Sequence, residues 1–182
     1  MVALPEVLAA GAVELRRCRL EDLDALLDAI ERSQPELARW LPWADPMPTA
    51  DAERDFLAVR RAAFDAEEDW GYFLIEAGTG ELVGGAGLHP KAGGVAEIGY
   101  WVCSDRTGRG YATAAAGALT AAAFAYLPEV ERVIIRMDKG NGASAAVPPK
   151  LGYRLAGEDT LREVVTSGHT GNGWIWVRTR PR

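Results

Sequence analysis

The stretch that most constrains what this chain can fold into is Ile98–Thr113, which reads IGYWVCSDRTGRGYAT. Its first residues are mostly apolar, aromatic or β-branched, as is typical of a buried strand. The next segment, 104–110, holds Ser, Asp, Thr and two Gly, which favour a turn. Nine alanines between residues 112 and 125 then predict a helix of about four turns. The chain is therefore expected to run from a strand through a short glycine-containing loop into a helix.

A loop of this kind is suited to binding an anion. The first N–H groups of the helix lack partners within it, and they lie at the positive end of the helix dipole. Gly108 and Gly110 have no Cβ atoms, so a ligand can approach the backbone closely. Arg106 and Arg109 add donors suited to phosphate oxygens. The alternative is a structural turn with solvated arginines, and the loop alone leaves both interpretations open.

The spacing of the glycines excludes two common phosphate-binding motifs. A P-loop has the pattern GxxxxGK[ST], which the sequence lacks. A dinucleotide fingerprint has the pattern GxGxxG/A, whereas here Gly108-x-Gly110-x-x is followed by Thr113. A protein that binds ATP or NAD is therefore a poorly supported interpretation.

The segment from Arg106 to Ala112, RTGRGYA, resembles the Q/R-x-x-G-x-G/A loop of the GNAT N-acetyltransferases. In that family the loop wraps the pyrophosphate of acetyl-coenzyme A. The longer run IGYWV…GRGYAT resembles the RimJ/RimL-type branch, whose members modify protein N-terminal amines and various small amines. The resemblance implies a coenzyme site formed by Trp101, Val102, Arg106, Gly108, Arg109, Gly110, Tyr111, Ala112, Thr113, Asn141 and Ser144.

A second stretch of the chain, 141–153, matches the family pattern N-x-x-S…K-L-G-F/Y. In the family this stretch is a helix packed alongside the coenzyme. Here Pro148 and Pro149 lie inside it, and an interior proline costs a helix about 3 kcal/mol. We therefore expect a shortened or kinked helix. A further departure is Ala114, where relatives often carry Glu.

The resemblance also implies how an acetyl group would be transferred. The strand ending at Val102 is expected to be splayed from the next strand, so that its free backbone groups bind pantetheine and an amide near Val102 stabilises the oxyanion. Glu97 is the first candidate base, acting through a water, although it could instead neutralise a strand edge or orient substrate. A protein α-amine, with a pKa of about 7.7–8.0, needs less help than a lysine amine at about 10.4. Glu163 is a second candidate.

The departing thiolate needs a hydrogen-bond donor or a proton. Ser144 matches the family serine, and we expect it to donate a hydrogen bond to sulfur. Tyr153 has a better-matched pKa of about 10, but its position is usually filled by a core aromatic. Asn141 is expected to bind the coenzyme or cap the helix. The WLPW segment resembles the acceptor side of RimJ/RimL-type enzymes, which makes Trp40, Trp43 and Glu97 candidates for substrate binding; the tryptophans could equally cap the core.

The fold expected from the resemblance is the α/β (α+β) GNAT fold, with a mixed, centrally splayed sheet of about six to seven strands and about four helices. Residues 1–12 are expected to be a flexible leader and 13–182 a single domain. Periodicity and turn signals predict the individual elements. The expected strands are Val13–Cys18, Trp70–Glu76, Glu81–His89, Val95–Val102, Val130–Met137, Tyr153–Gly157, Leu161–Thr166 and Trp174–Arg178. The expected helices before the loop are Leu20–Ser33 and one capped by Thr49 or Asp51 that ends near Ala66. Residues 34–48 are expected to form an irregular connector, with a short helix at 35–40 as an option.

The composition limits the kinds of ligand and partner that the protein is expected to bind. A net charge of −6 argues against non-specific nucleic-acid binding and mildly favours a cationic substrate. Cys18 and Cys103 form no CxxC pair, which fits a reduced, cytoplasmic protein. We expect neither a signal peptide nor a membrane span, and with two histidines no metal site is expected. The predicted partner is an amine acceptor, either a small molecule or a protein N-terminus, and a homodimer remains an option.

Two functions remain open. The first is an acetyl-CoA-dependent N-acetyltransferase that works by direct attack in a ternary complex. The second is a GNAT fold that binds coenzyme A as a sensor or interaction module without acetyl transfer. The paired prolines at 148–149 and Ala114, which depart from the family pattern, are the reason for the second.

Overall fold

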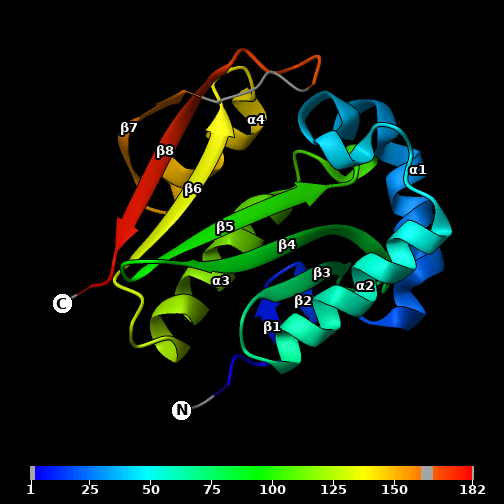
Figure 1. Ribbon diagram of the computed structural model, residues 1–182, viewed down its shortest axis with the longest axis horizontal. Helices are drawn as coiled ribbons and strands as arrows, with labels where there is room; N and C mark the ends of the chain where they lie inside the picture. Colours follow the sequence, from blue (N-terminus) through cyan, green and yellow to red (C-terminus); the bar gives the residue numbers. More distant parts are fainter. Residues whose placement is uncertain (1–2, 161–165, 182) are drawn as a thin grey trace.

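The computed structural model describes residues 3–160 and 166–181. Its centre is a sheet with the strand order β1-β2-β3-β4-β5-β6-β8-β7 (Figure 1). The strands are β1 (Val7–Ala10), β2 (Val13–Arg17), β3 (Trp70–Glu76), β4 (Leu82–Lys91), β5 (Val95–Val102), β6 (Arg132–Asp138), β7 (Arg154–Thr160) and β8 (Asn172–Thr179). The helices are α1 (Leu23–Trp40), α2 (Ala50–Asp65), α3 (Tyr111–Tyr126), α4 (Gly142–Ala145) and α5 (Val147–Lys150), with short 3₁₀ turns η1 (Leu20–Asp22), η2 (Pro42–Ala44) and η3 (Ser104–Arg106).

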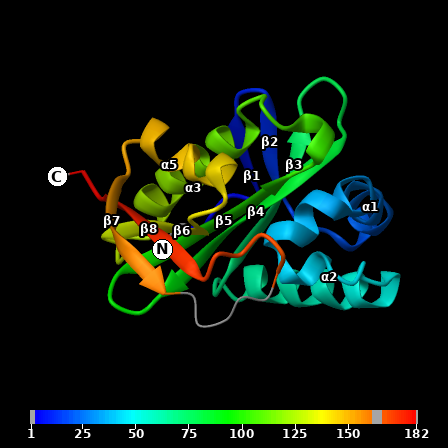
Figure 2. The same cartoon turned by 90° about the horizontal axis from the view of Figure 1, so that it is seen from above.

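The helices lie in two layers, one on each face of the sheet. Helices α1 and α2 lie on one side, whereas α3, α4 and α5 lie on the other (Figure 2). Strand β5 separates the two cores because its side chains alternate between the faces. Ala96 and Ile98 are buried in the core on the α3 side, while Trp101 packs against the core formed with α1 and α2.

The sheet is splayed at its centre, as predicted. Strands β5 and β6 are parallel, and they pair only where Val95–Glu97 face Arg132–Ile134. Beyond Glu97 the two strands diverge, while on its other edge β6 pairs along its whole length with β8 (Figure 1). The segment 98–102 therefore has an edge that no β6 residue covers. The right-handed β5–α3–β6 crossover required for a parallel pair accounts for the position of α3.

Two of the expected boundaries were wrong. Residues 1–12, expected to be a flexible leader, include strand β1, which pairs antiparallel with β2. The two strands are joined by a tight turn in which Gly11 has a φ of 68°, a conformation that glycine adopts without strain. Helix α1 does not stop at Ser33 but runs through Pro35 to Trp40. It continues because Ser33 and Leu37 extend its buried face by one more turn.

The sheet has eight strands in the described part of the chain, slightly more than expected. The addition is β1. The strand expected at Leu161–Thr166, and with it Glu163, falls mostly on 161–165, which lie outside the described residues. The remaining expected strands and the helix capped by Thr49 are confirmed.

The prediction of a shortened or kinked helix within 141–153 is confirmed. Two single-turn helices replace one helix: α4 ends at Ala145 and α5 begins at Val147. Pro148 occupies the first turn of α5, where the missing N–H would lack an intrahelical partner in any case. The Asn141 side chain accepts a hydrogen bond from the Ser144 N–H at 3.1 Å, so Asn141 caps α4. None of the described helices is long and apolar enough to cross a membrane.

Candidate functional site

The loop between β5 and α3 owes its shape to two glycines. Gly108 has a φ of 76° and Gly110, the N-cap of α3, has a φ of 81°. Both lie in the left-handed region that favours glycine. A Cβ atom built on either residue would meet no protein atom within 4 Å. The space beside these two glycines is therefore open, and the first N–H groups of α3 have no partner within the helix.

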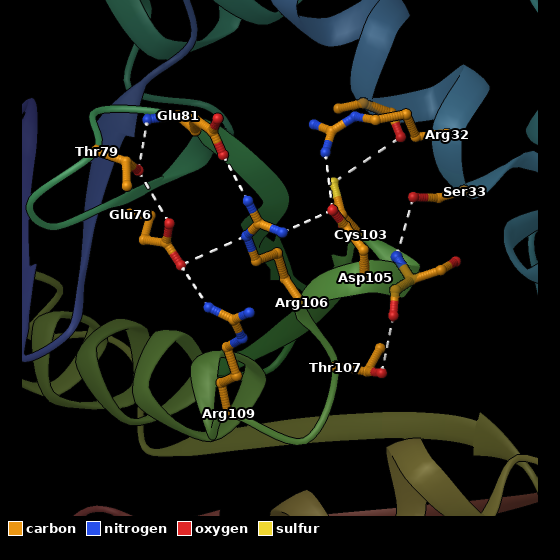
Figure 3. Close-up of polar contacts among 12 residues, drawn as sticks. Arg32, Ser33, Glu76, Thr79, Glu81, Cys103, Asp105, Arg106, Thr107 and Arg109 are labelled. Carbon is orange, nitrogen blue, oxygen red and sulfur yellow. Dashed lines mark hydrogen bonds and ion pairs between the residues drawn. The ribbon is translucent and has the colours of Figure 1, made fainter.

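The arginines of this loop are held by carboxylates from neighbouring elements (Figure 3). Arg106 forms ion pairs with Glu81 at 2.7 Å and Asp105 at 2.6 Å, and its Nε lies 3.5 Å from Glu76. Arg109 pairs with the same Glu76 at 3.2 Å. The sequence predicted that both arginines supply donors for phosphate oxygens; in the structure Arg106 also ties the loop to the β3–β4 hairpin. The Arg109 side chain is half-exposed, so it can still reach a ligand.

Glu76 is the centre of this network. It is buried near the end of β3 and accepts a hydrogen bond from the Tyr111 hydroxyl at 2.5 Å and one from Thr79 at 2.9 Å. The hydrogen bond from Tyr111 is the main cause that holds the pKa of Glu76 below its usual range, and Arg106 and Arg109 act in the same direction. A residue of β3 thus fixes both the loop and the first turn of α3.

A diphosphate fits this loop. The described residues offer an anion the positive end of α3, backbone that no Cβ shields and the Arg109 guanidinium. Ala112 and Thr113, the second and third residues of α3, are half-buried and contribute N–H groups at the same end. Val102, the last residue of β5, pairs with Gly84 of β4, and its other edge faces the splay.

The open edge of β5 meets the α4 turn. The Tyr100 hydroxyl donates to the Ser144 carbonyl at 3.0 Å, and the Ser144 hydroxyl donates to Tyr100 at 3.3 Å. The open edge of β5, Ser144 and the capping Asn141 are therefore close together. Tyr153 is elsewhere: it is 4% exposed, and its hydroxyl is 2.6 Å from that of Thr120 in the core. Burial raises the pKa of Tyr153 to about 12, which makes it a poor proton donor at neutral pH.

Glu97 lies where β5 and β6 separate, and both of its oxygens are held by a cation. Arg136 of β6 donates to them from Nε and a terminal nitrogen, each at 3.1 Å. Lys91 lies 3.6 Å away. Glu97 is therefore paired on both oxygens, in the geometry of a bidentate guanidinium–carboxylate contact. Glu97 has the position expected of it and stays a prediction as a base.

A cavity of about 360 Å³ lies between the sheet and the layer of α1 and α2. Its walls are mostly apolar, and Trp43 and Trp101 meet in it edge to face with centroids 5.9 Å apart. Glu53 of α2 also lines it, and burial raises the pKa of this carboxyl. Trp40 is not in the lining; its ring lies beside Gly168. Of the tryptophans predicted to bind substrate, Trp43 is brought to the cavity and Trp40 is not.

The cavity also contains a polar cluster that the sequence analysis missed. His89 Nδ1 lies 2.7 Å from Asp69, and Arg60 lies 2.7 Å from the other oxygen of Asp69. The three residues come from β4, the residue before β3, and α2, so no local motif connects them. A signal in the sequence is the set of three glycines in β4, because glycine inside a strand indicates a bulge or a close neighbour. In the structure Cβ atoms at Gly85 and Gly87 would collide with Trp101 and His89.

These features define a class of protein. A glycine loop open to an anion, a strand edge freed by a splay and an apolar cavity on the opposite face are the features expected of an acyltransferase that takes its acyl group from a coenzyme. Among the described residues, no group of three or more His, Cys, Asp and Glu could hold a metal ion.

Comparisons with known proteins identify the family. A profile for the acetyltransferase (GNAT) domain matches residues 12–154. A Bacillus subtilis (strain 168) protein named "Putative ribosomal N-acetyltransferase YdaF" is 33% identical over 153 residues, covering 80% of each chain. Mycobacterium smegmatis RimJ, solved with a CoA-disulfide, is similar with a TM-score of 0.83 and 25% identity over 96% of this chain and 88% of that one. RimL, a ribosomal L7/L12 α-N-protein acetyltransferase solved with coenzyme A, shares the fold, with a TM-score of 0.86 and 19% identity over 96% and 98% of the two chains.

The chain therefore belongs to the GNAT acetyltransferase family, as the loop and the 141–153 stretch predicted. It is an acetyl-CoA-dependent N-acetyltransferase that resembles the RimJ/RimL-type enzymes.

Proposed function

We propose that the protein transfers the acetyl group of acetyl-CoA to the α-amine of a protein N-terminus, by direct attack while both substrates are bound. The observation that carries the proposal is the open β5 edge, which borders the glycine loop and the α4 turn at one end and the apolar cavity on the other face. A donor and an acceptor can approach this edge from opposite sides. The Bacillus subtilis relative, named for ribosomal N-acetylation, supports a protein acceptor over a small amine.

The coenzyme is assigned to the α3 side of the splay. In the proposal, the N–H groups around Gly110, Tyr111 and Ala112 bind the diphosphate, with Arg109 beside them. Thr113 adds a further N–H group at this end of α3, and Arg106 orders the loop through its carboxylate partners. The backbone at Trp101 and Val102 binds the pantetheine chain, and Asn141 stays the cap that places Ser144.

The reaction needs a stabilised carbonyl oxygen and a thiolate that can leave. An amide of the open β5 edge near Val102 is assigned to the oxygen. The Ser144 hydroxyl is assigned to the sulfur, because it lies at the splay while the Tyr153 hydroxyl is turned into the core. A cytoplasmic location belongs to the same proposal, and it agrees with two buried cysteines that form no disulfide.

The test is turnover of acetyl-CoA over a panel of peptides with free N-termini and of small amines. Release of free thiol with peptide acceptors, and acetylation of the α-amine located by mass spectrometry, are the expected results. Thiol release with small amines alone would move the acceptor to the other class. Tight coenzyme binding without thiol release in the presence of any acceptor would instead establish a coenzyme-binding sensor or interaction module.

Glu97 can be tested in the same assay. If Glu97 takes the proton, Glu97→Gln lowers the rate at pH 7 more than at pH 9, because an α-amine with a pKa of about 7.7–8.0 is already neutral at the higher pH. An equal loss at both would assign Glu97 to structure, in line with its bidentate pairing with Arg136.

A further inference from the structure

Three glycines lie in register across the central strands, on the face that lines the cavity. Gly71 of β3 is paired with Gly87 of β4, which is paired with Gly99 of β5. A Cβ atom at Gly71 would lie 2.6 Å from Arg60 Nε, and one at Gly87 would lie 2.6 Å from His89 Nε2. No side chain fits at these two positions while the cluster keeps its place. The side chains of Arg60 and His89 therefore pack directly against the backbone of Gly71 and Gly87.

The same cluster fixes the state of the His89 ring. Burial alone would raise the pKa of Asp69, but the hydrogen bond from His89 and the charge of Arg60 hold it below its usual range. Asp69 is therefore a carboxylate and can only accept, so Nδ1 must carry the proton that it donates over 2.7 Å. In the neutral form of the ring, the lone pair is therefore on the other nitrogen, Nε2. A histidine oriented by a carboxylate in this way is prepared to take a proton.

The lone pair faces the strand at which transfer is proposed to occur. A Cβ atom at Gly99 would be 3.9 Å from His89 Nε2, an ordinary contact distance. Gly99 lies two residues beyond Glu97, within the part of β5 that β6 leaves uncovered. His89 and Glu97 are direct cross-strand partners on one face, so their side chains start side by side. Glu97 is held by Arg136, whereas His89 lines the cavity.

We propose that His89 is the general base that takes a proton from the acceptor amine, that Asp69 is its positioning residue, and that the glycine row seats the amine. The inference rests on the proposed function. The acceptor arrives as an ammonium ion and gives one proton to Nε2, which later releases it to water. The freed lone pair forms the C–N bond, the C–S bond breaks with its electron pair going to sulfur, and a second proton from nitrogen goes to that sulfur. The products are an amide and free coenzyme thiol.

Three variants and a surface control test this assignment. His89→Gln keeps a polar side chain but removes the base, and it should lower kcat/KM at pH 7 by about 10²- to 10⁴-fold, the range that general bases contribute. At pH 9 the loss should be smaller, because the α-amine is neutral there. The charged groups that face His89 are Arg60, Asp69 and Glu97, and Glu53 lines the same cavity.

Asp69→Asn should lower kcat while leaving the acceptor KM and the coenzyme Kd unchanged, since Asp69 acts through His89. Asp51→Asn, at a side chain that is 91% exposed on α2, is the matched control and should behave as the wild type. Gly99→Ala keeps the fold, because its methyl group meets Nε2 at 3.9 Å, but it occupies the proposed seat of the amine. It should raise the acceptor KM about tenfold or more, which corresponds to about 1.4 kcal/mol, with coenzyme affinity unchanged.

The outcomes separate the inference from the function on which it rests. A wild type that acetylates no amine would refute the proposed function. A wild type that is active, with His89→Gln retaining at least half of its kcat/KM at pH 7, would overturn the role of His89. A pH-dependent loss in Glu97→Gln but not in His89→Gln would assign the base to Glu97. If His89→Gln fails to fold, Gly99→Ala decides: an unchanged acceptor KM would overturn the seat and with it the inference.

Discussion

Replacing Gly110 by alanine tests two roles of this glycine, the relief of backbone strain and the access of a ligand to the loop. Gly110 has a φ of 81°, and no protein atom lies within 4 Å of the position of a Cβ. The variant therefore causes no clash, and its cost is that of an L-residue in the left-handed region, about 1–2 kcal/mol. For a domain of this size each kcal/mol lowers Tm by about 2–4 °C, so the expected decrease is about 2–8 °C.

The same methyl group points into the space assigned to the diphosphate. We expect coenzyme affinity, measured by isothermal titration, to fall at least about tenfold, or about 1.4 kcal/mol. Gly93→Ala is the matched control. Gly93 has a φ of 75° and equally open surroundings, but it lies in the β4–β5 turn, at the other end of β5 from the loop. It should lose the same stability and keep full coenzyme affinity.

Gly110→Asn provides a second way to distinguish the loss of stability from the loss of coenzyme affinity, because asparagine tolerates the left-handed region better than alanine does. It should cost less stability than Gly110→Ala and still weaken coenzyme binding. Wild-type coenzyme affinity in both Gly110 variants would show that the diphosphate is not bound at this loop. Equal stability of Gly93→Ala, Gly110→Ala and the wild type would refute the strain argument itself.

Three further predictions concern stability and reactivity. The pKa of Glu76 is lowered in the folded protein, so its contribution to stability is present above its unfolded pKa of about 4.3 and is lost as the pH falls through the folded value. In Glu76→Gln the free energy of unfolding, measured in urea at a series of pH values, should therefore fall less steeply at acid pH than in the wild type. The same acid dependence in both proteins would contradict the network around Glu76. Thr49→Ala removes the acceptor of the Ala52 N–H and should lower the free energy of unfolding, measured in urea, by about 1 kcal/mol. An unchanged free energy of unfolding would show that the Thr49 side chain does not stabilise α2. Burial raises the pKa of Cys18 to about 12, so a thiol reagent at pH 8 should label it far more slowly in the native protein than in urea, and equal rates would contradict that burial.

Local patterns predicted the elements whose residues carry their own signal. The alanines of α3, the apolar run of β5 and the Thr49 cap of α2 are each decided within a few residues, and each was placed correctly. Pro148 and Pro149 likewise predicted the break between α4 and α5. Strand β1 was missed because a short strand becomes stable only through its partner β2, and the end of α1 was missed because Leu37 gains its burial from the core.

The candidate site also contains some features that the sequence predicts locally and others that only the fold brings together. The glycine loop could be found in the sequence because its function depends on backbone shape, which Gly108 and Gly110 encode locally. The ion pairs of Arg106 and Glu97 could not be found in this way, since their partners Glu81 and Arg136 come from the β3–β4 turn and from β6. Sequence spacing says which residues a loop contains, but not which charges face it across the fold.

By itself, the sequence determined the family, the glycine loop, the broken helix at 141–153 and most of the strands, because each depends on contiguous residues. Tertiary structure alone decided which side chains meet in the cavity. His89, Asp69 and Arg60 are brought together by β4, the residue before β3, and α2, and the row from Gly71 through Gly87 to Gly99 exists only once three strands are in register. Strand register and helix packing are set by the whole core, so a cluster that depends on them has no signature along the chain.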